Sequence, residues 1–134
     1  MKIYLDFDGT VVEHAYPQIG NLNPGSFETM QKLQSAGHEL ILNTYRTDLK
    51  DGSFNDAIKF LNFNKKFKIK PILKRTRSKI NPPDWNLEDF IKKQTIFIDD
   101  ISKGIPLIKN IALEYGKMVD WVEIDKQFTK YRIY

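Results

Sequence analysis

Two pairs of acidic residues at the ends of short apolar runs are the part of the sequence best suited to chemistry. Asp6 and Asp8 follow the run IYL, and Asp99 and Asp100 follow the run IFI. If both runs are strands of one parallel sheet, ligands bind outside their carboxyl ends, and the four carboxylates converge there. Carboxylate oxygens with no nearby His or Cys favour Mg²⁺ over zinc. The pattern therefore predicts a magnesium site with these four residues as candidate ligands.

The D-x-D spacing of Asp6 and Asp8 suits phosphoryl transfer. Side chains alternate along a strand, so the two carboxylates can differ in direction and in role. One can attack a phosphate monoester while the other handles a proton, provided that cations neutralise the phosphoryl oxygens. Such a site also needs a hydroxyl and an ammonium group. Thr44, after the apolar run LIL, offers the hydroxyl, and a lysine near the third or fourth strand offers the charge.

Strand-like and helix-like patterns alternate along the chain, which is typical of a parallel α/β sheet. Pro71 has no amide to donate, so the third strand is expected at a sheet edge. Residues 11–23 are predicted to be an irregular loop or a small hairpin, 47–52 a polar turn, and 104–118 either strand or helix. The predicted strands are 2–5, 38–44, 68–73 and 95–98. The predicted helices begin at Pro24, at a capping box of Ser53 and Asp56, near Leu87, and after Asp120.

Three motifs resemble those of the haloacid dehalogenase-like (HAD) phosphohydrolases. Residues 3–11, IYLDFDGTV, are similar to the first motif, a hydrophobic strand followed by DxDGT. Residues 40–44, LILNT, resemble the second motif, and 96–100, IFIDD, resemble the fourth. The motifs occur in the family's order and cover residues 2 to about 108. The resemblance implies a three-layer Rossmann-like α/β fold, with helices on both faces of a central parallel sheet, and we expect residues 1–134 to form one domain.

The resemblance also implies roles for individual residues. Asp6 would be the nucleophile that forms an aspartyl-phosphate, and a metal ligand. Asp8 would protonate the leaving group and then activate water, with its backbone carbonyl on the metal. Thr44 would bind the transferring phosphoryl group. Asp99 or Asp100, or both, would complete the Mg²⁺ site.

The family's third motif is a single basic residue, which pattern alone does not fix. Lys79 is preferred because it follows the predicted third strand, and Lys92 or Lys93 is the alternative. Arg46 either clamps a substrate phosphate or is a surface charge. His14 is expected to be a solvated histidine in the loop that forms a flap over the site in this family. The residues expected to contact the substrate are Gly9, Thr10, Asn43 and Arg46.

The spacing between motifs leaves no room for the cap domain that sets specificity in many members of the family. There are 37 residues between Asp6 and Thr44 and 54 between Thr44 and Asp99. Both stretches are filled by the predicted loop, helices and strand. We therefore expect a capless protein with an open site, which in relatives often goes with macromolecular substrates or a neighbouring subunit as lid.

Composition excludes several classes of protein. Of 134 residues, 41% are hydrophobic and 28% charged, which is ordinary globular usage. The absence of cysteine excludes a disulfide framework, a thiolate zinc site and a catalytic thiol. Three apolar residues before Asp6 are too few for a signal-peptide core or a membrane span, so a cytoplasmic protein without membrane contact is expected.

Positive charge is concentrated in one segment. Residues 59–79 hold nine basic residues and no acid, leaving 12 basic and 17 acidic residues elsewhere. Such a segment can attract nucleic acid, although a solvated face is the more ordinary explanation. Three functions stay open: a Mg²⁺-dependent phosphatase for a phosphorylated small molecule or nucleotide, a polynucleotide-end phosphatase, and a non-catalytic phosphate-binding or receiver-like signalling domain. The DxDGT motif on the first strand favours the phosphatase. No feature of the sequence predicts an oligomeric state.

Overall fold

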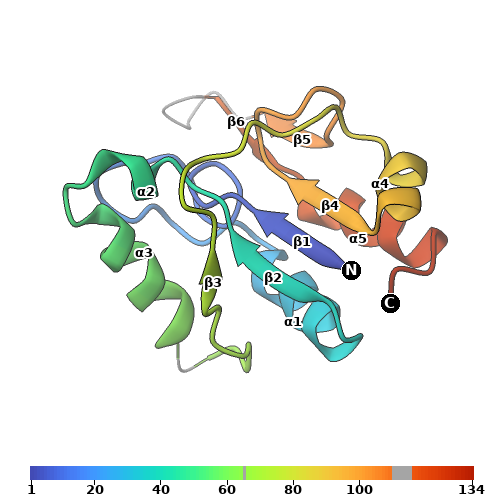
Figure 1. Ribbon diagram of the computed structural model, residues 1–134, viewed down its shortest axis with the longest axis horizontal. Coiled ribbons are helices and arrows are strands. Elements are labelled where there is room, and N and C mark those ends of the chain that lie inside the picture. The colour runs from blue at the N-terminus through green and yellow to red at the C-terminus, as the bar shows by residue number, and fades with distance from the viewer. Residues whose placement is uncertain (65, 110–115) are drawn as a thin grey trace.

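The computed structural model describes residues 1–64, 66–109 and 116–134. Its centre is a four-stranded parallel sheet in the order β3-β2-β1-β4, with all arrowheads pointing to the same edge (Figure 1). The expected parallel α/β sheet is therefore confirmed. The strands are β1 (Lys2–Leu5), β2 (Glu39–Leu42), β3 (Lys74–Arg75) and β4 (Thr95–Ile98).

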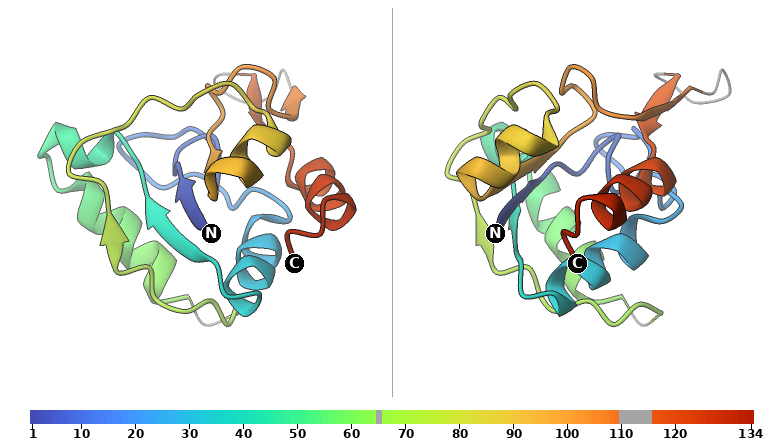
Figure 2. Two further views of the ribbon diagram at one scale, coloured as in Figure 1. Left: turned by 45° about the vertical axis from the view of Figure 1, so that its right-hand side comes forward. Right: turned by 90° about the vertical axis from the view of Figure 1, so that its right-hand side faces the viewer.

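Helices lie on both faces of the sheet, but unequally. The edge-on view shows α1, α3 and α5 on one face and α4 on the other (Figure 2). Because α4 stands alone, the second layer covers only part of the sheet. The helices are α1 (Ser26–Ser35), α2 (Arg46–Leu49), α3 (Ser53–Asn62), α4 (Leu87–Lys93) and α5 (Trp121–Lys130).

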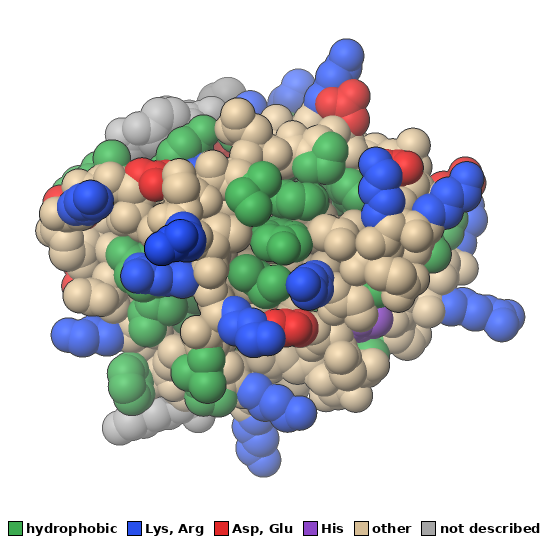
Figure 3. Space-filling model, viewed as in Figure 1, with side chains coloured by type: hydrophobic (Ala, Val, Ile, Leu, Met, Phe, Trp, Pro, Cys, Tyr) green, Lys and Arg blue, Asp and Glu red, His purple; other side chains and the backbone are tan. Residues whose placement is uncertain are grey.

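Strand alternation separates a deep core from a shallower face. Ile3 and Leu5 of β1 are fully buried, in one core with residues of α1, α3 and α5. Tyr4 points to the opposite face, where its ring stacks on that of Phe97 at 4.7 Å between centroids. Figure 3 shows hydrophobic side chains gathered over the middle of this view, with Lys and Arg around them. The incomplete second layer thus leaves apolar sheet surface partly exposed.

A short antiparallel hairpin lies beside the carboxyl ends of the strands. It consists of β5 (Leu107–Lys109) and β6 (Lys117–Val119), so parts of the ambiguous segment 104–118 are strands. Residues 110–115 of that segment lie outside the described residues. The amide of Val119 donates to the carbonyl of Gly9 at 3.0 Å, which ties the hairpin to the D-x-D-G turn. The side chain of Asp120 caps α5, as expected.

The third strand differs from the prediction. No strand occupies 68–73; β3 is the dipeptide that follows, although it does lie at the sheet edge. Two side-chain amides take the place of a neighbouring strand. Gln34 bonds both the amide and the carbonyl of Lys70, and Asn62 bonds those of Ile72. Backbone groups satisfied in this way do not need a ladder, so the segment stays coil.

Two local details around α3 also differ from expectation. The predicted polar turn 47–52 overlaps the single-turn helix α2, which begins at Arg46 and ends at Leu49. The capping box is wrong: Ser53 is already helical, and Gly52, with φ of 86°, stands at the N-cap. The carboxylate of Asp51 accepts from the Ser53 amide at 3.0 Å.

In the loop 11–23, Val12 forms an antiparallel bridge with Leu22, so the small hairpin is present in rudimentary form. Among the described residues, no helix has the length and apolar character needed to cross a membrane.

Candidate active site

Three buried carboxylates meet at the carboxyl ends of β1 and β4. Asp6 follows β1, while Asp99 and Asp100 follow β4, and one oxygen of each lies within 4.8 Å of the others. The two strands are neighbours, with Leu5 opposite Ile98, so the residues after them start side by side. The sheet thus brings together acids that are far apart in the sequence.

Lys79 is the ammonium group of this cluster. Its Nζ donates to Asp6 Oδ1 at 2.9 Å, to Asp99 Oδ2 at 2.5 Å and to a backbone carbonyl at 3.1 Å, and its side chain is 2% exposed. The alternatives lie elsewhere. Lys93 pairs with Asp89 at 3.1 Å on the exposed side of α4, and Lys92 is also exposed on that helix. The structure therefore places the preferred lysine at the carboxylates.

One ammonium does not neutralise the acids. Burial raises the pKa of Asp6 well above its ordinary value, and the neighbouring Asp99 adds to this against the opposing effect of Lys79. Burial also raises the pKa of Asp99. Burial lowers the pKa of Lys79, but the carboxylates of Asp6 and Asp99 outweigh it, so that pKa is raised. Burial therefore disfavours the charged forms of Asp6 and Asp99, and a further cation beside them would favour those forms.

His14 reaches the third carboxylate from the loop. Its Nε2 lies 2.8 Å from Asp100 Oδ2, and the side chain is 23% exposed, so the expectation of a solvated histidine is wrong. Burial raises the pKa of Asp100, but the His14 hydrogen bond and other favourable contacts outweigh it, and the pKa is lowered. Gly9 permits this contact: its φ is 77°, and a Cβ there would lie 2.1 Å from His14 Nε2. The glycine of the motif therefore makes room for the histidine.

Thr10 and Asn43 hold the site in shape. Thr10 Oγ1 donates to Asp6 Oδ2 at 3.1 Å and accepts from the amide of Asp100 at 3.2 Å, which joins the ends of β1 and β4. The Asn43 side chain bonds both the amide and the carbonyl of Ile80, which fixes the coil that carries Lys79. Both were expected to contact the substrate, as was Gly9. Gly9, Thr10 and Asn43 are not among the described residues that line the pocket between these carboxylates and the solvent.

Arg46 and Asp8 form a bidentate ion pair. Arg46 Nε donates to Asp8 Oδ2 and Nη2 to Asp8 Oδ1, both at 2.8 Å, and Arg46 is 1% exposed. Its guanidinium also donates to the carbonyls of Pro17, Gln18 and Ser53. The surface-charge alternative is therefore wrong, and the donors that a phosphate clamp would use already bind protein atoms. Arg46 instead orients Asp8 and ties the loop to α3.

The four carboxylates, Lys79, His14 and Arg46 line a pocket of about 330 Å³. Thr44 lies in its wall, where its Oγ1 accepts from the amide of Arg46 at 3.2 Å. Volume and convergent polar groups are typical of a small-molecule site. The lining residues are Asp6, Asp8, His14, Tyr16, Thr44, Tyr45, Arg46, Leu49, Lys79, Asp99, Asp100 and Ile101.

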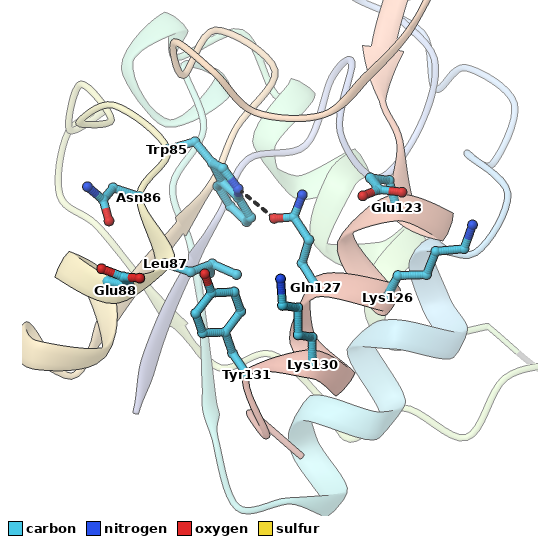
Figure 4. Close-up of a pocket in the computed structure, with 9 residues that line it drawn as sticks. All are labelled: Trp85, Asn86, Leu87, Glu88, Glu123, Lys126, Gln127, Lys130 and Tyr131. Atoms are coloured by element: carbon cyan, nitrogen blue, oxygen red, sulfur yellow. Dashed lines mark hydrogen bonds between the residues drawn. The ribbon is translucent and has the colours of Figure 1, made fainter.

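A second hollow, of about 490 Å³, lies between α4 and α5 (Figure 4). Trp85 Nε1 donates to Gln127 Oε1 at 3.0 Å across it. The Trp85 ring packs against those of Phe90 and Phe128. This hollow shares no residue with the carboxylate pocket, so neither the carboxylates nor Lys79 line it. We therefore place the chemistry in the carboxylate pocket.

No family model and no curated protein matches the chain. A solved structure described as the conserved protein coded by locus from Bacteroides thetaiotaomicron is similar, with 27% sequence identity and a TM-score of 0.57. The match covers 98% of this chain and 91% of that one. The description names no activity, so the likeness supports the α/β fold and leaves the function to the site itself.

Proposed function

We propose that this chain is a Mg²⁺-dependent phosphohydrolase of the capless HAD-like type. The observation that carries the proposal is the buried convergence of Asp6, Asp99 and Asp100 on Lys79 at the end of a parallel sheet. Thr44 and Asp8 lie in the same pocket, at the positions that the motifs give them.

The three carboxylates suit Mg²⁺. They offer hard oxygen donors within 4.8 Å of one another, and burial raises the pKa values of Asp6 and Asp99, an effect that a bound cation would oppose. Asp6, Asp99 and Asp100 would hold the ion, with the Asp8 backbone carbonyl as a further donor. When bound, Mg²⁺ would neutralise phosphoryl oxygens and so favour attack by an anionic nucleophile.

The protein residues would then act in two steps. An oxygen of Asp6 attacks phosphorus and the bond to the ester oxygen breaks, while Asp8 gives the departing alcohol its proton. Water next attacks the aspartyl-phosphate and gives a proton to Asp8; the bond to Asp6 breaks, and inorganic phosphate leaves. Lys79 and Thr44 hold the phosphoryl oxygens throughout. Because both oxygens of Asp8 accept from Arg46, each proton transfer requires one of these hydrogen bonds to lengthen.

The segments between the motifs favour the capless type. The first gap is taken up by the loop and α1, and the second by α2, α3, β3 and α4. None of these described elements forms a second domain above the pocket. The mouth is bordered by single side chains instead.

Phosphate release tests the proposal. Wild type and Asp6→Asn are assayed on an aryl phosphate with Mg²⁺ and with chelator, and Asp89→Asn, on the exposed side of α4, serves as a matched control. We expect release only where both Mg²⁺ and Asp6 are present, with the control unchanged. Phosphate release in the presence of chelator, or phosphate release by Asp6→Asn, would refute the mechanism. A stable phosphoprotein without turnover would favour the receiver-like alternative.

A further inference from the structure

Exposed apolar side chains gather at the mouth of the pocket. Tyr16, Tyr45, Leu49 and Ile101 are each 43–51% exposed and all line it. They come from four places: the loop 11–23, the turn after β2, α2, and the turn after β4. Single exposed hydrophobic residues are ordinary, but four that converge on one opening indicate an apolar ligand group.

The two tyrosine rings are held in place before any ligand binds. The hydroxyl of Tyr16 donates to Asp51, and that of Tyr45 donates to Asn81 Oδ1 at 3.3 Å. The Tyr16 ring lies 5.3 Å from the Arg46 guanidinium, and the Tyr45 ring lies 5.1 Å from Lys79 Nζ. A ring fixed at its hydroxyl and by a cation loses little freedom when a ligand stacks on it.

Cations are scarce where a second anionic group would bind. Among the described lining residues the only lysine and arginine are Lys79 and Arg46, and carboxylates neutralise both. Other members of the basic segment face elsewhere: Lys74, Arg75 and Arg77 line a separate hollow along β3. The pocket is therefore poorly suited to a polyanion, in which further phosphates would stay unpaired.

We infer that the site takes a phosphate monoester of an uncharged alcohol that carries a flat, unsaturated ring close to the ester oxygen. This rests on the proposed phosphatase function and adds the substrate class. The phosphoryl group would lie among Lys79, Thr44 and the carboxylates, and the ring against Tyr16 and Tyr45. Leu49 and Ile101 would cover its edges. The inference argues against polynucleotide ends and nucleoside polyphosphates as substrates.

The test compares three esters of primary alcohols, so that the leaving groups are alike: benzyl, cyclohexylmethyl and glycerol phosphate. We expect kcat/KM for benzyl phosphate to exceed that for glycerol phosphate by about tenfold or more, with cyclohexylmethyl phosphate between them. Tyr45→Ala and Tyr16→Ala should each lower kcat/KM for benzyl phosphate by on the order of tenfold, and for glycerol phosphate by about twofold or less. Tyr131→Ala, a half-exposed tyrosine away from the pocket, should change neither.

The outcomes separate this inference from the proposed function. Asp6-dependent release with no preference among the three esters would overturn the inference and leave the phosphatase intact. Equal losses on all esters in the tyrosine variants would do the same, as would faster release from a 3′-phosphorylated oligonucleotide. No Asp6-dependent release from any ester would overturn the phosphatase. In that case, calorimetric binding of benzyl phosphate no tighter than glycerol phosphate would overturn the inference as well.

Discussion

The substitution Arg46→Met should lower the free energy of unfolding, because it leaves the Asp8 carboxylate without its ion-pair partner. Arg46 is 1% exposed and Asp8 17% exposed, and two hydrogen bonds of 2.8 Å join them. Removing one partner of a buried pair typically costs about 3–5 kcal/mol, and the partial exposure of Asp8 puts this case at about 3 kcal/mol. Three backbone carbonyls lose a donor as well.

For a chain of this size, about 3 kcal/mol corresponds to a fall in Tm of roughly 10–15 °C. The assay is urea denaturation of wild type, Arg46→Met, Asp8→Asn and the double variant. The double variant should lose clearly less than the sum of the two single losses, since the unpaired carboxylate is absent from it. Lys93→Ala, which breaks an exposed pair on α4, should change the free energy of unfolding by about 0.5 kcal/mol or less. Strict additivity of the two pocket substitutions, or a loss at Arg46 no larger than at Lys93, would refute the reasoning.

Four further outcomes follow from the site. Asp6→Asn should abolish phosphate release and leave the far-UV circular dichroism spectrum unchanged, because the amide has the shape of the carboxylate but does not attack phosphorus; residual turnover would contradict the assigned nucleophile. Lys79→Ala should lower kcat by on the order of 10²-fold or more, while Lys93→Ala should not, and equal losses would contradict the placement of the ammonium. Gly9→Ala should lower both Tm and activity, because a methyl group there meets the loop histidine at 2.1 Å and φ is 77°; a fully active, stable variant would show that the loop contact is dispensable. Hydrogen bonds from Ser53 and Tyr16 hold the pKa of Asp51 at about 2, below its ordinary value. The ionised Asp51 therefore stabilises the fold fully above about pH 4, and this stabilisation is lost as the pH falls through about 2. The difference in unfolding free energy between wild type and Asp51→Asn should therefore shrink below about pH 4, and a constant difference would contradict this.

The features predictable from the sequence are those encoded locally. An apolar run followed by acids specifies both a buried strand and the group at its end, so the positions of Asp6, Asp99 and Asp100 followed from pattern. The Asp120 cap was equally local, since its side chain binds an amide three residues on.

The features that escaped prediction depend on contacts between distant segments. The run 68–73 has strand-like residues, but Gln34 and Asn62, on two different helices, satisfy its backbone instead of a neighbouring strand. The contact of His14 with Asp100 joins positions 86 apart, and nothing in the loop 11–23 predicts it. Local propensity carries no information about which distant side chain competes for a backbone group or a carboxylate.

Charge balance explains why Asp8 pairs with Arg46. Each carboxylate at the edge of the sheet needs a compensating cation or donor, because burial without one is costly. The structure pairs Lys79 with Asp6 and Asp99, and His14 with Asp100; with these contacts known, Asp8 is the carboxylate that still needs a partner. Strand β2 pairs with β1, so Arg46, two residues beyond Thr44, follows the end of a strand that lies beside the D-x-D turn. The bidentate pair of Arg46 and Asp8 thus joins an acid that follows one strand to a cation that follows the adjacent strand.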